Sequence, residues 1–469
     1  MTATATGNRR EDRTAQRFIE SMRGPVIQPS DPAFETSRAV YNAMIDRRPS
    51  MLVECADVAD VINAVKIARE EDMLVAVRGG GHNVAGLGTC DDGIVIDLAA
   101  MNGVRVDPDR KTVRVGGGAT WGEVDHATHV FGLATPSGII STTGVAGLTL
   151  GGGFGYLSRR YGLSCDNLIS ADVVTADGEL RVASADQNAD LFWAIRGGGG
   201  NFGVVTSFEF QLHPASNVYG GPIFYPAEHA DKLLHFYRDY MQSAPNEMSA
   251  FFSFHQGPPA PYIPEHLHFV PMVAIVTCYA GDDPGNGEEV IRPLRNVVEP
   301  AVDLAGLHPY PALNSMFDGL YAPGLQHYWK TDYVPALSDE AISVHDRFGP
   351  RVPSLHSAMH LYPQTGAIQQ VDETATAYSH RDDDYVYVII AADADPANMA
   401  DNIAWMQQYD DALRPHSGSS GYVHFLMQGE GKERVKASYG ANYERLVEIK
   451  TRYDPGNLFR VNQNIEPRS

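Results

Sequence analysis

RGGGHNVAG, residues 78–86, is the stretch that decides the fold of this chain. It lies between two apolar runs, 74–77 and 94–98, that are typical of buried strands. Glycine inside a regular element costs roughly 0.5–1 kcal/mol, so three consecutive glycines favour a loop whose backbone approaches a ligand. Without Cβ atoms, neighbouring N–H groups can converge on an anion, and the loop therefore predicts a phosphate-binding site.

Two further glycine clusters follow, SGIISTTGVAGLTLGGGFG at 137–155 and GGGGNFG at 197–203. Any one cluster is equally consistent with ordinary tight turns, but three within some 120 residues favour a nucleotide site. Residues 198–203 match the GxGxxG pattern, yet they open the alternating strand 204–210 where a Rossmann fingerprint would open a helix. The pattern GxxxxGK[ST] of P-loop proteins does not occur in the sequence.

The order of predicted elements indicates an α+β protein with two domains. A helix is expected from 58 with Asp57 as its N-cap, another over 121–131, and a third in the C-terminal stretch that begins YGANYERL at 439, ended by residues 454–457. β-type runs at 251–254, 272–279 and 385–390 predict one antiparallel sheet. We expect a first, glycine-rich nucleotide-binding domain over 1–215 with its core at about 45–215. A substrate-binding domain would span 216–410, and a C-terminal segment, 411–469, would return to the first domain.

Composition narrows the class of protein. The 469 residues are 43% apolar and 20% charged, as in globular domains, and the net charge of −22 argues against nucleic-acid partners. Four dispersed cysteines show no CxxC pair, so neither a disulfide scaffold nor a zinc site is indicated. The polar start, without an apolar run, and the lack of a membrane-length apolar stretch predict a cytoplasmic protein without a membrane partner.

Four ordered motifs carry a family resemblance over nearly the whole chain: RGGGHN at 78–83, the block 137–155 with YGLSCDN at 161–167, FWAIRGGGGNFGVVT at 192–206, and YDPGNLFRVNQNI at 453–465. With them the chain resembles the berberine-bridge-enzyme-like and hydroxynicotine-oxidase-like branch of the vanillyl-alcohol oxidase superfamily. The resemblance implies a PCMH-type FAD-binding fold plus a substrate domain with an antiparallel sheet backed by helices. It also implies FAD as the cofactor.

The resemblance assigns His82 to the histidine that is bonded to the 8α-methyl group of the flavin. Many relatives add a second bond through a cysteine, where this chain has Ile140, so a single histidyl link is expected. Cys165 lies in a later motif and is interpreted as a packed thiol. The other residues matched to FAD contacts are Arg78, Gly79, Gly80, Gly81, Asn83, Gly86, Ser137, Gly138, Ser141, Thr142, Gly144, Gly152, Gly155, Val204, Val205, Asn462 and Asn464.

The sequence does not decide which residue is the catalytic base. Sugar-oxidising relatives place a tyrosine where this chain has Phe425, which leaves His424 as a substitute, or as a strand residue that faces away. Alkaloid-oxidising relatives use a carboxylate on a strand of the substrate sheet. In the most similar segment here, His360 and Tyr362 alternate onto one face, as candidate bases or as a satisfied core pair. Tyr328, Trp329 and Lys330 are expected either to line a pocket or to pack between the domains.

The expected activity is that of an oxidase. FAD would take hydride at N5 from an alcohol or amine carbon of a small to medium, aromatic or secondary-metabolite substrate, and O2 would reoxidise it to give hydrogen peroxide. Thr143 matches the family position that controls oxygen access. A sugar or oligosaccharide oxidase is an alternative, disfavoured by Phe425 and by Val84. A non-catalytic flavin-binding protein is a second alternative. The sequence leaves substrate and oligomeric state open.

Overall fold

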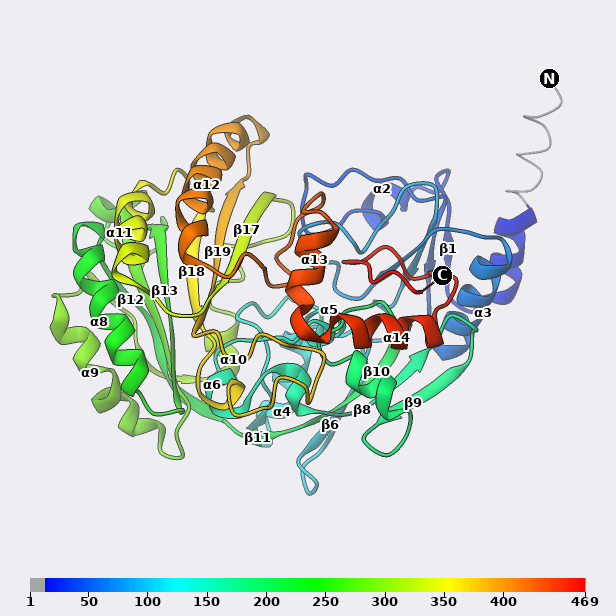
Figure 1. Ribbon diagram of the computed structural model, residues 1–469, viewed down its shortest axis with the longest axis horizontal. Coiled ribbons are helices and arrows are strands. Elements are labelled where there is room, and N and C mark those ends of the chain that lie inside the picture. Colours follow the sequence, from blue (N-terminus) through cyan, green and yellow to red (C-terminus); the bar gives the residue numbers. More distant parts are fainter. Residues whose placement is uncertain (1–12, 469) are drawn as a thin grey trace.

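The structure, a computed structural model, describes residues 13–468 of the chain. Two lobes lie side by side, one built on two smaller sheets and one on a single large sheet (Figure 1). Mixed helix and strand of this kind is the predicted α+β class. The polar start, for which no leader is expected, and the first residues of the predicted 1–215 domain lie outside the described residues.

A four-stranded sheet carries the first glycine loop. Its order is β1-β2-β4-β3, with β1 (Val26–Ile27), β2 (Met51–Glu54), β3 (Val75–Arg78) and β4 (Ile94–Asp97). β2 and β3 both run parallel to β4, and α3 (Val58–Glu70) makes the crossover between them. The predicted cap is present, because the Asp57 carboxylate accepts hydrogen bonds from the N–H groups of Ala59 and Asp60.

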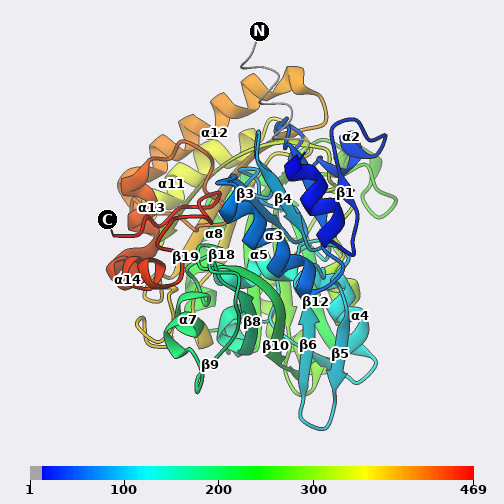
Figure 2. The same ribbon diagram turned by 90° about the vertical axis from the view of Figure 1, so that its right-hand side faces the viewer.

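The second sheet of this lobe is antiparallel and lies against α3 (Figure 2). Its order is β5 (Val104–Asp107), β6 (Thr112–Gly116), β10 (Val204–Gln211), β8 (Leu168–Val174) and β9 (Leu180–Ser184). The glycines at 198–203 lead directly into β10, so this GxGxxG pattern does open a strand. α4 (Trp121–His129), α5 (Val145–Leu150), α6 (Ser158–Tyr161) and α7 (Ala189–Ala194) complete the lobe, together with the short pair β7 (Leu133–Ala134) and β11 (His213–Pro214). α4 ends two residues before the predicted limit, at a turn closed by Gly132 with a φ of 69°.

The three β-type runs of the second half lie in one antiparallel sheet, as predicted. Its order is β15 (Val302–Asp303), β12 (Asn217–Pro226), β14 (Pro271–Tyr279), β13 (Met248–Gln256), β18 (Ala358–Pro363), β19 (Tyr385–Asp393) and β17 (Gln326–Val334), and β16 (Gly306–Pro309) pairs with β12. Each of these pairings is antiparallel.

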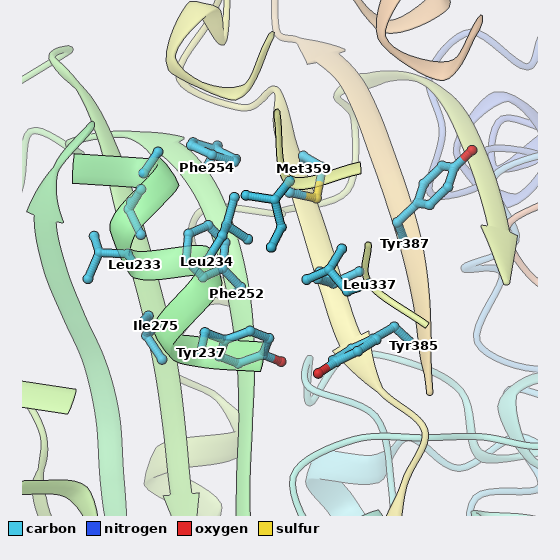
Figure 3. Packing of buried hydrophobic residues seen from close by; sticks show 14 of the residues in the cluster. Leu233, Leu234, Tyr237, Phe252, Phe254, Ile275, Leu337, Met359, Tyr385 and Tyr387 are labelled. Carbon is cyan, nitrogen blue, oxygen red and sulfur yellow. The ribbon is translucent and has the colours of Figure 1, made fainter. Parts of the chain in front are cut away.

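Four helices of the second lobe cover one face of the large sheet. These are α8 (Ala230–Ser243), α9 (Gly287–Val297), α11 (Asp339–Phe348) and α12 (Met399–Leu413). Side chains such as Phe252 and Met359 pack against Leu234 of α8 on that face (Figure 3). Because side chains alternate along a strand, Phe251 and Tyr362 point to the opposite face, toward the first lobe. The uncovered face therefore becomes a wall between the lobes.

The chain returns to the first lobe at its C-terminal end. α13 (Lys432–Tyr439) and α14 (Tyr443–Tyr453) lie beside α5 and β10 (Figure 1). Leu446 and Ile449 of α14 join the core of the antiparallel sheet of that lobe, and Tyr443 packs against this core. In the described chain no helix is both long enough and apolar enough to span a bilayer.

Candidate active site

One cavity of about 280 Å³ runs between the lobes. Its walls combine the glycine loops of the first lobe, two strand side chains of the large sheet, and two segments near the C-terminus at 422–425 and 459–463. Segments that are more than 300 residues apart in sequence therefore share one wall. A cleft between domains is where protein sites for small molecules and cofactors are most often built.

The first two glycine loops meet backbone to backbone. A Cβ placed on Gly80 would lie 2.6 Å from the nitrogen of Gly144, so neither position has room for a side chain. In the described chain the N–H groups of Gly80, Gly81 and His82 donate to no protein acceptor, although these residues line the cavity. Unpaired N–H groups facing a concave wall are suited to holding a phosphate oxygen.

The third glycine segment is joined to the C-terminal tail. The Asn462 amide donates to the carbonyl of Gly200 at 3.1 Å, and the Asn201 amide donates to the carbonyl of Gln463 at 3.2 Å. The fully buried Lys450 donates to the Asn201 carbonyl and to the Asp454 carboxylate, at 2.8 and 2.6 Å. This buried ion pair fixes the tail over the glycines.

The cavity wall contains no carboxylate, lysine or free cation among the described residues. Its one formal charge is Arg78, whose guanidinium is paired with Asp97 at 2.5 Å. In a chain with a net charge of −22, a wall without carboxylates removes the repulsion that an anionic ligand would meet. The long apolar part of the wall suits planar rings.

His82 projects into the cavity from the end of the first loop. Its ring stacks on Tyr41, with the ring centroids 3.8 Å apart, and its Nε2 atom lies 3.4 Å from the Thr142 hydroxyl. The exposed part of the imidazole faces the cavity, and burial lowers its pKa to about 4. The side chain is therefore neutral at neutral pH and has a nitrogen lone pair.

Tyr362 and His360 form a hydrogen-bonded pair on the uncovered face of the large sheet. Tyr362 lines the cavity, and its hydroxyl donates to Nδ1 of His360 at 2.5 Å. His360 lies behind it and donates through Nε2 to the Tyr321 hydroxyl at 3.3 Å. Burial and the nearby His255 lower the pKa of His360 well below its usual value. The imidazole is thus neutral beside a phenol that faces the cavity.

His424 approaches the cavity from the C-terminal wall. It lies in a turn, so the alternative of a strand residue that faces away does not hold. Its Nε2–H donates to the Leu148 carbonyl at 2.9 Å, which leaves Nδ1 as an acceptor. Burial lowers the pKa of His424 to about 4. Phe425 and Trp329 meet edge to face beside it, with centroids 5.3 Å apart, and both line the cavity.

Many of the residues singled out from the sequence line this cavity. They are Arg78, Gly79, Gly80, Gly81, His82, Asn83, Gly138, Thr143, Gly144, Val205, Tyr362, His424 and Asn462. Trp329 lines it too, while the neighbouring Lys330 forms an ion pair with Glu430. Cys165 is buried and free, as the interpretation of a packed thiol requires.

Other expected contact residues lie behind the wall. They are Gly86, Ser137, Ser141, Thr142, Gly152, Gly155, Val204 and Asn464. The Ser137 hydroxyl pairs with Tyr310, and the Ser141 hydroxyl pairs with Asp318.

Four other residues of this group pack against neighbouring parts of the protein. Gly155 packs on the Ser137 carbonyl, which a Cβ would approach to 2.3 Å. A Cβ on Gly86 would likewise lie too close to the Ile45 side chain, and a Cβ on Gly152 too close to the Tyr378 ring. Val204 points to the opposite face of β10 from Val205 and packs with the α3 core.

The wall residues that were not singled out from the sequence include three aromatic ones, Phe154, Tyr422 and Tyr439. Phe154 ends the second glycine cluster, and its ring is 4.7 Å from that of Tyr422. The prediction for this block rested on its glycines and hydroxyl residues and left out Phe154. An aromatic ring beside glycines is itself a signal of a ligand wall. In the described part of the chain no group of three His, Cys, Asp or Glu side chains could hold a metal ion.

Comparison with known proteins places these features in a family. A model of an FAD binding domain matches residues 49–184, and a model described as berberine and berberine like matches 421–466. An FAD-linked oxidoreductase of Dictyostelium discoideum is 31% identical over 458 residues, which cover 96% of each chain. The chain belongs to the berberine-like family of FAD-linked oxidoreductases.

Two further relatives of this berberine-like oxidoreductase carry named activities. (R)-6-hydroxynicotine oxidase of Paenarthrobacter nicotinovorans is 29% identical over 464 residues, 95% of this chain and 97% of the relative. The crystal structure of 6-hydroxy-D-nicotine oxidase from Arthrobacter nicotinovorans has a TM-score of 0.86 at 27% identity, covering 96% of this chain and 99% of that one. The berberine-like protein is an FAD-dependent oxidase, and the range of its relatives leaves the substrate class open.

The cavity of this berberine-like oxidoreductase fits FAD. Free N–H groups at 80–82 would hold the pyrophosphate, and the wall without carboxylates accepts its charge. Val205 and the tail residues 459–463 would cover the adenine end. Ile139, Ile140 and the turn at 423–425 would border the isoalloxazine end, next to His82, Tyr362 and His424.

Proposed function

We propose that this protein is an oxidase with FAD bonded covalently to His82, acting on an alcohol or amine carbon of an uncharged, ring-containing substrate. Bound FAD would accept hydride from that carbon at N5 and pass the electrons to O2, giving hydrogen peroxide. The neutral imidazole of His82, directed into the cavity, supports the covalent part of the proposal. Ile140, which also lines the cavity, supports a single link, because its side chain cannot form a second bond.

The pair Tyr362 and His360 is the observation that carries the proposed activity. Hydride loss from an alcohol or amine carbon requires that a proton leave the neighbouring oxygen or nitrogen. Tyr362 would accept this proton while its own hydrogen passes to Nδ1 of His360, 2.5 Å away. Nucleophilic and acid–base sites are commonly built in this way, with one group facing the substrate and a second held behind it.

His424 is a second acceptor, contributed by the C-terminal turn. Its hydrogen bond to the Leu148 carbonyl leaves Nδ1 free for a substrate hydroxyl or N–H group. Its partner is a backbone carbonyl and not a second titratable group, which favours a role in orienting the substrate. Tyr362 and His360 would thus accept the proton, and His424 would orient the substrate.

The rings at this end of the cavity favour an aromatic substrate. Phe154, Trp329, Tyr422 and Phe425 contribute apolar faces, and no formal charge lies among them. A sugar donates and accepts many hydrogen bonds, which four aromatic faces do not satisfy. Phe425 also lacks the hydroxyl that a tyrosine would supply at that place. These features disfavour the alternative of a sugar or oligosaccharide oxidase.

Anaerobic bleaching of the flavin tests the activity directly. Purified protein is mixed without oxygen with hydroxylated aromatic compounds, cyclic amines, simple alcohols and oligosaccharides, and the flavin absorbance is followed. Rapid bleaching by ring-containing alcohols or amines, and hydrogen peroxide on admission of air, is the expected result. Bleaching by oligosaccharides alone would instead support the sugar oxidase. If no compound in any class bleached the flavin, the non-catalytic alternative would stand.

The covalent link is tested separately. Acid-precipitated wild-type protein should stay yellow, and the peptide that contains residue 82 should carry the mass of FAD. The His82→Ala variant should release all of its flavin into the supernatant. A wild-type protein that also releases all of its flavin would disprove the link without affecting the assignment of FAD.

A further inference from the structure

A short N-terminal segment, residues 41–43, joins the first glycine loop to the large sheet. The Tyr41 N–H donates to the Gly81 carbonyl at 3.1 Å, and the Tyr41 carbonyl accepts from Gly324 at 3.0 Å. The Asn42 amide donates to the carbonyls of Val84 and His327, at 2.7 and 3.0 Å. Both residues are buried. The segment is therefore held at both lobes by its backbone and by one amide.

Tyr41 fills the space beside His82. Its ring stacks on the His82 imidazole at 3.8 Å with 20° between the planes, and on the His327 ring at 4.8 Å with 17°. Its hydroxyl donates to the Tyr321 carbonyl at 3.1 Å. Every polar group of Tyr41 is thus bonded away from His82, and only the flat face of the phenol contacts the imidazole.

His82 has few other restraints. In the described chain the Thr142 hydroxyl, at 3.4 Å, is the one side chain within hydrogen-bond distance of the imidazole. Gly80 and Gly81 before it have no side chains to limit its rotation, and the far side of the ring is open to the cavity. Stacking on Tyr41 is consequently the main contact that sets the plane of the ring.

We propose that Tyr41 is a positioning residue that holds the imidazole of His82 in the plane required for its attachment to FAD. The inference rests on the proposed covalent link. Attachment replaces the imidazole N–H bond and one C–H bond of the flavin 8α-methyl group by a C–N bond. The two hydrogens and two electrons that are released pass through the flavin to O2, which becomes hydrogen peroxide.

Orientation decides the rate of such a step. The nitrogen lone pair lies in the plane of the imidazole, so a ring rotated out of plane directs the lone pair away from the methyl carbon. Holding a reacting group in place is worth large factors in rate, and misplacement by 1 Å can cost about a hundredfold. A stacked ring restrains rotation without donating a proton, and it leaves the lone pair of the neutral imidazole unoccupied.

The test compares three variants for covalent attachment rather than for turnover. Tyr41→Phe keeps the stacked ring and loses only the hydroxyl, whereas Tyr41→Leu keeps apolar volume and loses the ring. Tyr237→Leu is a matched control, since Tyr237 is a fully buried tyrosine of α8 whose hydroxyl also donates to a backbone carbonyl, that of Ala250 at 2.9 Å. Each protein is produced under riboflavin limitation and mixed with FAD in air. Samples are quenched in acid, and the protein-bound flavin is measured over time.

We expect Tyr41→Phe and Tyr237→Leu to attach FAD at close to the wild-type rate. Tyr41→Leu should still bind FAD but attach it about tenfold more slowly or worse. Thermal melting of the variants shows whether lost attachment follows lost folding. Wild-type attachment together with normal attachment in Tyr41→Leu would overturn the inference alone. Equal slowing in Tyr237→Leu would overturn it in favour of general destabilisation. A wild-type protein without covalent flavin would overturn both this inference and the proposed link.

Discussion

The two walls of the cavity are built by different means. The wall from the first lobe presents backbone: in the described chain the N–H groups of Gly80, Gly81 and His82 have no protein acceptor, and Gly80 and Gly144 leave no room for a Cβ between them. The wall from the large sheet and the C-terminal turn presents side chains, chiefly Tyr362, Trp329, His424 and Phe425. A backbone wall depends on glycine at fixed positions, whereas a side-chain wall can be formed from many combinations of residues. The first kind leaves a pattern in the sequence, and the second does not.

The largest expected effect lies in the backbone wall. Replacing Gly80 by valine places side-chain atoms against the backbone of Gly144, which a Cβ would approach to 2.6 Å. We expect a loss of stability of about 3 kcal/mol or more, together with loss of bound FAD. Melting temperature and flavin absorbance of the purified variant provide the measurement.

Gly103→Ala is the control for this substitution, because a Cβ at Gly103 meets no atom within 4 Å. Its stability should change by no more than about 0.5 kcal/mol. A Gly80→Val protein that remained stable and yellow would show that the two loops can separate, and the contrast between the walls would lose its basis.

The side-chain wall predicts a different outcome, in which chemistry fails and the fold remains. Tyr362→Phe removes the hydroxyl that contacts His360 and should lower the anaerobic rate of flavin reduction by ~10²–10⁴-fold. FAD content and melting temperature should change little. Stopped-flow absorbance with a saturating substrate measures the rate.

Tyr225→Phe serves as the matched control, since its hydroxyl donates to the Leu294 carbonyl on the helix-covered face of the same sheet. It should reduce FAD at the wild-type rate. If Tyr362→Phe reduced FAD at the wild-type rate, His424 would be the proton acceptor instead. His424→Asn should then be the variant with the slower flavin reduction.

Buried histidines of the large-sheet lobe predict how the stability of the protein depends on pH. In the large-sheet lobe burial lowers the pKa of His255 to about 4 and those of His327 and His345 to about 3. Unfolded histidine titrates near its ordinary value, so below about pH 6.5 the unfolded chain binds more protons than the folded one. Stability should therefore fall as the pH decreases from about 6.5 to 4, by up to about 1.4 kcal/mol per pH unit for each histidine.

The first lobe contains a group of opposite sign. Burial raises the pKa of Asp125 to about 7, so its contribution to stability is present at low pH and is lost as the pH rises toward 7. Melting temperatures measured from pH 4 to 8 should show the net fall at low pH. His345→Gln should make that fall shallower, and Asp125→Asn should make it steeper. A melting temperature independent of pH between 6.5 and 4 would contradict the assignment of neutral buried histidines.

The smallest expected effect concerns oxygen. Thr143 lines the cavity from the backbone wall, and Thr143→Leu would fill space there with a larger apolar side chain. We expect several-fold slower reoxidation of reduced FAD by O2, with flavin reduction unchanged. Thr143→Val, of nearly equal volume, should behave as the wild type. Stopped-flow mixing of reduced protein with aerated buffer measures this step, and equal rates in all three proteins would remove Thr143 from the oxygen path.

Much of the fold could be predicted from local signals. The cap at Asp57, the strand after the glycines at 198–203, and the single antiparallel sheet all follow from turn chemistry and from periodicity. Errors occurred at element ends and where tertiary contacts prevail. One alternative for His424 was a strand residue that faces away, yet its ring packs against Gly151 and its Nε2 atom bonds to the Leu148 carbonyl, and these contacts select a turn.

The glycine loops were the part of the site that the sequence determined by itself. A close approach of two backbones excludes every side chain, so positions such as Gly80 and Gly144 admit one residue type and form a visible pattern. That pattern predicted a nucleotide site, and the family resemblance of the motifs implied FAD and the role of His82. Tertiary structure alone decided which side chains complete the site. Tyr41, Tyr362 and His424 come from three distant segments, and each faces His82 or the cavity only because the two lobes pack together.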